Sequence, residues 1–194
     1  KLIPSLNPRS DIKIYIIDDF SRREAMSEVV LDAMIEAMED KDFRRELSYY
    51  IKPSTTRSPV GMPGSTINIP LPLSYVASTV IRNLNTGRFQ RKQDEPLLKK
   101  FTPLFIIIAT EDDSPEAWIE TGRIYERIAL ESARRNISTH PMAAAIQIGN
   151  FYKELQRLLE TSYRPQMFFR MGFAKTQPPH SPRLTPTDVC DMKI

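Results

Sequence analysis

Few residues of this chain have the type and spacing of a side-chain catalyst. The two histidines, His140 and His180, lie far apart in the sequence, and neither sits in an HExxH or CxxC context, so a zinc site is not indicated. The single cysteine, Cys190, has no neighbouring cation cluster to activate its thiol and cannot supply a multi-thiolate metal site. Glu111, Asp112 and Asp113 could bind a metal, but their position before a predicted helix favours capping and compensation of the helix dipole.

Nucleophile and phosphate-loop motifs are also missing from the sequence. It contains no GxSxG elbow, no GxxxxGK[ST] loop and no GxGxxG fingerprint. The turn at residues 61–65, Gly-Met-Pro-Gly-Ser, contains a proline, which argues against a phosphate cradle of the P-loop kind. Any chemistry of this protein is therefore not expected to depend on a side-chain triad.

The composition is that of a globular protein with a real core. Of 194 residues, 41% are hydrophobic and 26% are charged, which excludes disorder of the whole chain. The net charge of +3 is too small to indicate a nucleic-acid binder, and for the basic segment 82–100 a solvated basic face is favoured over a phosphate or nucleic-acid patch. No apolar stretch is long enough for a membrane helix, and residues 1–8 do not resemble a signal peptide, so we expect a cytoplasmic protein.

Periodicity in the first half predicts one strand and three helices. The β-branched stretch 12–17 predicts a strand, and a capping box at residues 21–24 predicts that a helix with an apolar stripe follows. A second helix is expected over 42–52, and a third over 73–85. The intervening residues 53–73 are rich in proline and predict a long irregular connection, which is often functional in a compact domain.

The second half continues the mixture of strands and helices. Residues 104–109 are apolar on both faces, which predicts a central strand. Ser114 followed by proline predicts the start of a helix that runs to about residue 135 and presents one face of five residues: Trp118, Thr121, Tyr125, Ile128 and Ser132. A helix over 144–160 and a strand over 166–171 follow, and a proline-rich segment, 172–183, comes after them.

Four stretches of the sequence stand out together by their order and spacing. They are Phe43-Arg44-Arg45-Glu46-Leu47, similar to an R-x-E-L helix; Pro103–Ala109 with Asp112, Asp113 and Trp118–Gly122; Asn136–Gln147 with Thr139-His140-Pro141-Met142; and Pro165–Phe173 followed by Ser181-Pro182-Arg183. Their order resembles the flavin-dependent nitroreductase superfamily, and most of all its divergent branch of nitroreductase-like proteins related to dormancy-associated mycobacterial proteins. The likeness covers most of residues 40–190.

The resemblance implies a fold, a cofactor and partners. The fold would be α+β, with a mainly antiparallel central sheet flanked by helices, in an intertwined homodimer that holds FMN at the subunit interface. FMN would carry the redox chemistry, with NAD(P)H as electron donor and a quinone-like or nitroaromatic compound as acceptor. No catalytic side chain and no metal are expected.

The resemblance also implies which residues touch the flavin. The backbone of Pro141, Met142, Ala143 and Ala144 would approach the ring, and a backbone N–H there would stabilise the reduced form. Arg183 matches a C-terminal arginine that pairs with the FMN phosphate. Relatives often have two arginines at this position, so phosphate affinity would be weaker here.

The start of the chain departs from the family pattern. An arginine-rich helix and an N-x-Q-P-W segment are expected there, and residues 7–10, Asn-Pro-Arg-Ser, do not match them. We therefore expect a single nitroreductase-like domain, residues 1–194, that forms the C-terminal portion of a longer chain. Two other functions stay open. One is a non-catalytic module that sequesters flavin or regulates; the other is an interaction domain that uses the basic segment 82–100 on nucleic acid.

Overall fold

The computed structural model describes residues 9–176 and 179–190. The chain divides into two compact units, residues 1–37 with 87–175, and residues 38–86 with 176–194. Each unit is described by itself below.

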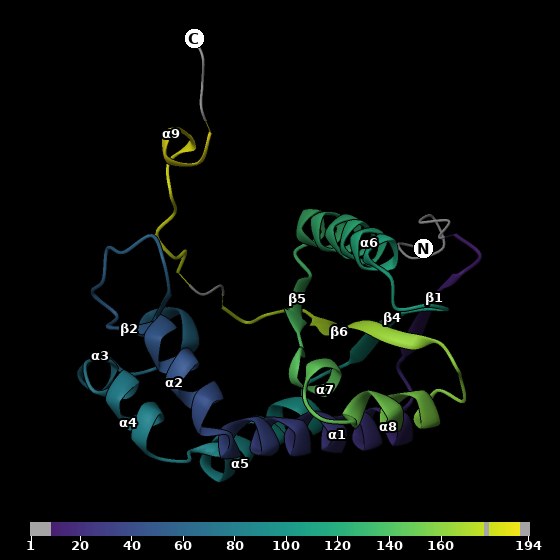
Figure 1. Ribbon diagram of the computed structural model, residues 1–194, viewed down its shortest axis with the longest axis horizontal. Helices are drawn as coiled ribbons and strands as arrows, with labels where there is room; N and C mark the ends of the chain where they lie inside the picture. The colour runs from purple at the N-terminus through teal and green to yellow at the C-terminus, as the bar shows by residue number, and fades with distance from the viewer. Residues whose placement is uncertain (1–8, 177–178, 191–194) are drawn as a thin grey trace. The chain divides into compact units, whose positions relative to one another are not determined.

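A four-stranded sheet forms the centre of the first unit (Figure 1). Its strands, in spatial order, are β1 (Ile12–Ile17), β4 (Leu104–Thr110), β6 (Arg164–Gly172) and β5 (Ser138–Pro141). Every neighbouring pair is antiparallel, which confirms the α+β class with a mainly antiparallel central sheet. The strands predicted over 12–17, 104–109 and 166–171 are present, whereas β5 was not predicted.

The two faces of the sheet carry separate apolar clusters, because alternate side chains of a strand point to opposite faces. In β4, Ile106 and Ile108 pack with α6 (Pro115–Arg134), whereas Phe105 and Ile107 pack on the opposite face, and all four are fully buried. That opposite face is covered by α1 (Phe20–Glu39), α7 (Ala144–Gln147) and α8 (Phe151–Leu158) (Figure 1). The prediction of a central, doubly buried strand at 104–109 is therefore confirmed.

The starts of the two long helices show one correct and one wrong capping prediction. Ser114 caps α6, because its Oγ accepts a hydrogen bond from the Ala117 N–H at 3.3 Å. The predicted capping box at Ser21 is wrong: α1 begins at Phe20, and the Asp19 carboxylate accepts from the Arg22 N–H at 2.8 Å. The last of two acids after β1 thus caps the helix, rather than the serine that follows them.

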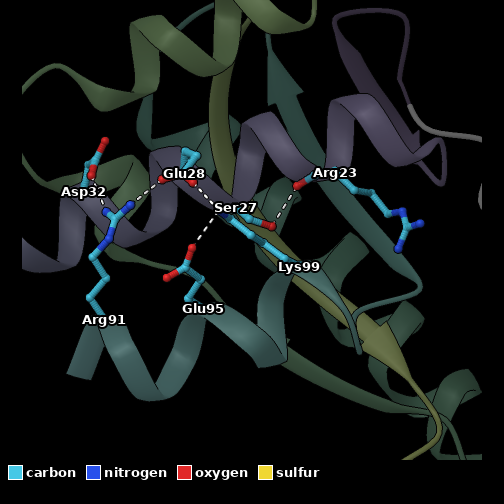
Figure 2. Close-up of polar contacts among 7 residues, drawn as sticks. All are labelled: Arg23, Ser27, Glu28, Asp32, Arg91, Glu95 and Lys99. Atoms are coloured by element: carbon cyan, nitrogen blue, oxygen red, sulfur yellow. Dashed lines mark hydrogen bonds and ion pairs between the residues drawn. The ribbon is translucent and has the colours of Figure 1, made fainter. Parts of the chain in front are cut away.

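Helix α5 (Gly87–Lys99) was not predicted, and ion pairs hold it against α1 (Figure 2). The Arg91 guanidinium donates to Glu28 and to Asp32, each at 2.5 Å. The Lys99 ammonium pairs with the same Glu28 and with Glu95, the latter at 2.8 Å. Arg91 and Lys99 belong to the basic segment 82–100, and these two charges are compensated by neighbouring carboxylates.

Two predicted helices are interrupted in the structure. The helix predicted over 144–160 is broken into α7 and α8 around Gly149, whose φ of +46° is a left-handed conformation that glycine adopts readily. The helix predicted over 73–85 is split into α3 (Leu71–Ser74) and α4 (Ala77–Asn83). Among the described residues no helix combines the length and the apolar character needed to cross a membrane.

The second unit is mainly helical around a small core. Helix α2 (Lys41–Tyr50) ends two residues earlier than predicted, because Ile51 and Lys52 form β2 (Ile51–Lys52), which pairs in parallel with β3 (Met62–Pro63). The segment 53–73, predicted to be irregular, also holds the 3₁₀ helix η1 (Gly64–Ile67) and the start of α3. The short α9 (Pro186–Val189) lies near the end of the described chain. The buried core of this unit consists of Met38, Ile51, Ala77 and Ile81.

Candidate functional site

The segment Pro141–Ala144, expected to approach a flavin, leaves the edge of the sheet in the first unit. Strand β5 is the edge strand, and its pairing with β6 ends at the Pro141–Phe169 pair. Just beyond it, the Met142 N–H donates to the Phe168 carbonyl at 2.8 Å, and the Met142 side chain is buried in the core. Met142 therefore anchors the segment to the sheet.

This anchoring divides the four predicted residues into two kinds. Pro141 has no N–H, and the Met142 N–H is already used, so neither can donate to a cofactor. For Ala143 and Ala144, by contrast, the described part of the chain supplies no acceptor for the backbone N–H. Ala143 is exposed, Ala144 is half-buried, and both have a side chain small enough for close approach of a ligand. The two alanines retain the donor capacity that was expected of the whole segment.

A group of charged side chains adjoins the start of this segment. His140 pairs across the sheet with Arg170 of β6, and the Arg170 Nη1 donates to the Thr102 hydroxyl at 3.5 Å. Burial raises the pKa of the Asp94 carboxyl, and the Arg170 cation opposes that rise. Although His140 keeps an exposed surface, desolvation by the protein around its ring and the Arg170 cation together lower its pKa. Burial also lowers the pKa of Arg170, whereas the Asp94 carboxylate raises it, so these two opposite charges partly compensate each other.

Sequence reasoning did not find this charged group, because its members are remote in the chain. Asp94 belongs to α5, which was not predicted. Arg170 lies in strand β6, where its immediate neighbours in the sequence are hydrophobic. The only signal in the sequence is a charged residue in β6 beside fully buried phenylalanines, Phe168 and Phe169.

Residues from two of the family-like motifs meet in a hydrogen-bonded cluster at the start of α6. The Asp113 carboxylate accepts from the Trp118 Nε1 at 2.6 Å and from the Gln166 Nε2 at 2.9 Å. These two hydrogen bonds, led by that from Gln166, lower the pKa of Asp113. Trp118 was expected on the buried face of α6, but its side chain is 52% exposed, and the buried face consists of Ala117, Thr121, Ile124, Ile128 and Ser132. The described residues contain no group of three or more acidic, histidine or cysteine side chains placed to hold a metal ion.

The R-x-E-L motif has a structural role within the second unit. Arg44 is buried, and its Nη1 donates to the carbonyl oxygens of Met38 at 2.6 Å and Glu39 at 3.0 Å. These are terminal carbonyls of α1, which lack partners within the helix and carry its negative dipole end. The first arginine of the motif therefore caps a helix.

Arg183, the expected partner of the FMN phosphate, lies in the extended segment before α9. Its side chain is exposed and has no ion-pair or hydrogen-bond partner among the described residues. The guanidinium is thus available to an external anion. Arg183 and the segment 141–144 belong to different compact units.

Comparison with known proteins identifies the fold. No protein-family model and no curated protein sequence matches the chain. Among solved structures, the FMN-dependent nitroreductase NfnB from Mycobacterium smegmatis in complex with NADPH matches with a TM-score of 0.59 and 11% identity, over 100% of this chain and 85% of that one. The FMN and NADPH-dependent nitroreductase NfnB from Sphigopyxis sp. strain HMH matches with a TM-score of 0.58 and 13% identity, over 98% and 85% of the two chains.

A third structure agrees with these two. The nitroreductase-like family protein from Bacillus cereus matches with a TM-score of 0.50 and 12% identity, over 98% of this chain and 83% of that one. The chain therefore has a nitroreductase-like fold, as the order of its motifs predicted.

Proposed function

We propose that this protein is an FMN-dependent oxidoreductase that takes electrons from NAD(P)H and passes them to a quinone-like or nitroaromatic acceptor. The observation that carries the proposal is the likeness of fold, over almost the whole chain, to nitroreductases described as dependent on FMN and NADPH. The absence of a side-chain triad from the sequence is consistent with a cofactor that supplies the redox chemistry.

The residues of the first unit fit the edge of a flavin ring. Ala143 and Ala144 offer backbone N–H groups that find no acceptor in the described part of the chain, on residues too small to obstruct a planar ligand. Met142 and the Phe168 carbonyl fix the segment that carries them. When bound, FMN would accept a hydride from the nicotinamide and deliver electrons to the acceptor. The role of the chain is to bind the ring, orient it and hold donors toward it.

Arg183 fits the phosphate end of the same cofactor. A planar guanidinium can donate two parallel hydrogen bonds to phosphate oxygens, and that of Arg183 is exposed and unpaired within the described residues. We further propose a cytoplasmic homodimer. A run of exposed apolar side chains over residues 71–84 of the second unit supports an interface between copies; its members are Leu71, Leu73, Tyr75, Val76, Val80 and Leu84.

Paired ligands and paired variants test the cofactor assignment. Ala143 has φ near −63°, which suits proline, so Ala143→Pro removes one N–H with little backbone strain, and Ala143→Gly is the control that keeps it. We expect Ala143→Pro to weaken FMN binding about fivefold, as measured by quenching of flavin fluorescence. Arg183→Gln should weaken binding of FMN at least about tenfold but leave binding of riboflavin, which has no phosphate, unchanged.

Turnover separates the enzyme from the flavin-sequestering module. Oxidation of NADPH at 340 nm, with menadione or a nitrobenzoate as acceptor, is expected from the FMN-loaded protein. Bound FMN without NADPH or NADH oxidation would select the non-catalytic module, and a protein that neither binds FMN nor gains thermal stability from it would refute both functions. Size-exclusion chromatography with light scattering tests the homodimer.

A further inference from the structure

A hollow in the second unit gathers basic side chains from three separate elements. It has a volume of about 430 Å³, within the range of small-ligand sites. Its cations are Arg45 of α2, Lys52 of β2 and Arg82 of α4, and none of the described residues that line it is a carboxylate. The remaining lining residues are Ser48, Tyr49, Ile51, Pro53 and Ser78.

Most of the cationic side chains of this basic hollow form no strong ion pair with the described residues. Arg82 has no ion-pair or hydrogen-bond partner among the described residues. Lys52 lies over the Tyr49 ring, with its Nζ 4.7 Å from the ring centroid. Arg45 pairs only with Asp42, at 3.1 Å, and both side chains are more than half exposed, so this pair adds little stability and can rearrange.

Two carbonyl oxygens that would repel an anion already accept hydrogen bonds from serine hydroxyls inside the hollow. The Ser78 hydroxyl donates to the Ser48 carbonyl at 2.7 Å, and the Ser48 hydroxyl donates to the Arg45 carbonyl at 2.7 Å. The acidic residues Asp40, Asp42 and Glu46 line a neighbouring hollow that shares Arg45 and Tyr49 with the basic one. The basic hollow thus combines a cationic lining with local satisfaction of these two carbonyl groups.

The fold also positions Lys52. Gly61 has a φ of +111°, and a Cβ on it would lie 2.8 Å from the Lys52 Cγ and 2.6 Å from the Tyr50 carbonyl oxygen. The Gly61 backbone therefore packs directly on the aliphatic stem of Lys52, which reduces the side-chain freedom that a bound anion would otherwise have to restrict.

We propose that the basic hollow binds the phosphate groups of a nucleotide, with Arg45, Lys52 and Arg82 on the phosphates and the base against Tyr49. Three lining cations, of which only Arg45 has a carboxylate partner, in an exposed pair with Asp42, favour a multiply charged anion. Phosphate is an anion that arginine and lysine side chains recognise. The Tyr49 ring and Pro53 supply the apolar surface that a base requires and that an inorganic anion does not. The volume suits a small molecule rather than a nucleic-acid strand.

Calorimetric titration of the full chain with ADP and with inorganic pyrophosphate, at low salt and without FMN, tests this site. We expect ADP to bind, pyrophosphate to bind more weakly, and Lys52→Gln and Arg82→Gln each to weaken ADP binding at least about tenfold. Arg57→Gln is the matched control, because Arg57 is an exposed cation of the same unit that does not line the hollow. Circular dichroism of each variant verifies that it is folded.

Four results would overturn the proposal. They are failure of the unsubstituted chain to bind ADP, an equal loss of binding in Arg57→Gln, pyrophosphate binding as tight as that of ADP, and loss of ADP binding when the protein is saturated with FMN. The last result would place the two ligands in one site. The FMN-saturated sample is a separate titration. The titration without flavin succeeds or fails independently of the proposed redox activity.

Discussion

Replacing Arg44 by methionine should destabilise the second unit, whereas the same change at the adjacent Arg45 should not. Arg44 donates two hydrogen bonds to carbonyls at the end of α1 and is only 7% exposed. Hydrogen bonds from a charged donor contribute about 1.5–3 kcal/mol each. The Arg44 Nε is buried without a hydrogen-bond partner, so its removal recovers a desolvation cost of about 1–3 kcal/mol. Methionine also keeps much of the apolar stem of the arginine side chain. The net loss in the free energy of unfolding is therefore about 2 kcal/mol.

Arg45 provides the control within the same motif. Its side chain is 67% exposed and forms one surface ion pair, so Arg45→Met should cost about 0–0.5 kcal/mol. Urea unfolding followed by far-ultraviolet circular dichroism measures both variants, and amide hydrogen exchange of residues 38–50 locates the effect. Equal stability of the two variants would refute the capping role. Loss of FMN binding by Arg44→Met at unchanged stability would instead assign the motif to the cofactor.

Two further predictions concern titratable contacts of the first unit. Hydrogen bonds from Lys99 and then Arg91 lower the pKa of Glu28, so the stability they contribute is present above the ordinary value of 4.5 and is lost as the pH falls through the lower folded value. Glu28→Gln should therefore lower the urea midpoint at pH 7, and its difference from the parent should shrink below pH 4.5; a difference independent of pH would contradict the ion-pair role of α5. The pKa of Asp113 lies below its ordinary value of 3.8, and Trp118 is the single tryptophan, so the tryptophan fluorescence of the parent should change only below pH 3.8. Asp113→Asn should abolish that change, and its persistence would exclude Asp113 as the group that Trp118 senses.

The elements that the sequence predicted correctly are those with strong local patterns. β4 is a continuous apolar run, and a central strand buried on both faces requires such a run. The start of α6 has a serine cap and a proline in the first turn, which act locally and are unaffected by the rest of the fold.

The missed elements depend on contacts between distant residues. β5 is four residues long, polar, and ends in proline, so its pattern gives no strand signal; only its pairing with β6 at the sheet edge makes it a strand. α5 is rich in charge and contains Pro96, and its ion pairs with α1 stabilise it from outside. The Glu95–Lys99 spacing was a helical signal in this segment.

Prediction of the candidate site shows the same contrast between local sequence patterns and contacts of distant residues. Pro141–Ala144 and Arg183 were predicted from a resemblance of motifs, which suggests positions but not which N–H groups stay available. The structure adds that Met142 is anchored and that Ala143 and Ala144 are not. Arg170 and Asp94 could not be associated from sequence, because their interaction exists only once α5 and β6 are folded.

The motifs from which the fold was predicted are therefore poor evidence for the activity. Arg44 caps α1, and Asp113, Trp118 and Gln166 form a cluster at the start of α6, so each has a structural reason to be present in a chain that binds no flavin. The residues proposed to bind the flavin, Ala143, Ala144 and Arg183, add little to the fold through the groups assigned to the cofactor, because those N–H and guanidinium groups have no partner among the described residues. Substitutions at these positions should consequently change FMN binding at nearly constant stability, while substitutions at the motif residues should do the reverse. Measuring both FMN binding and stability for the two sets of variants therefore separates retention of the fold from retention of the function.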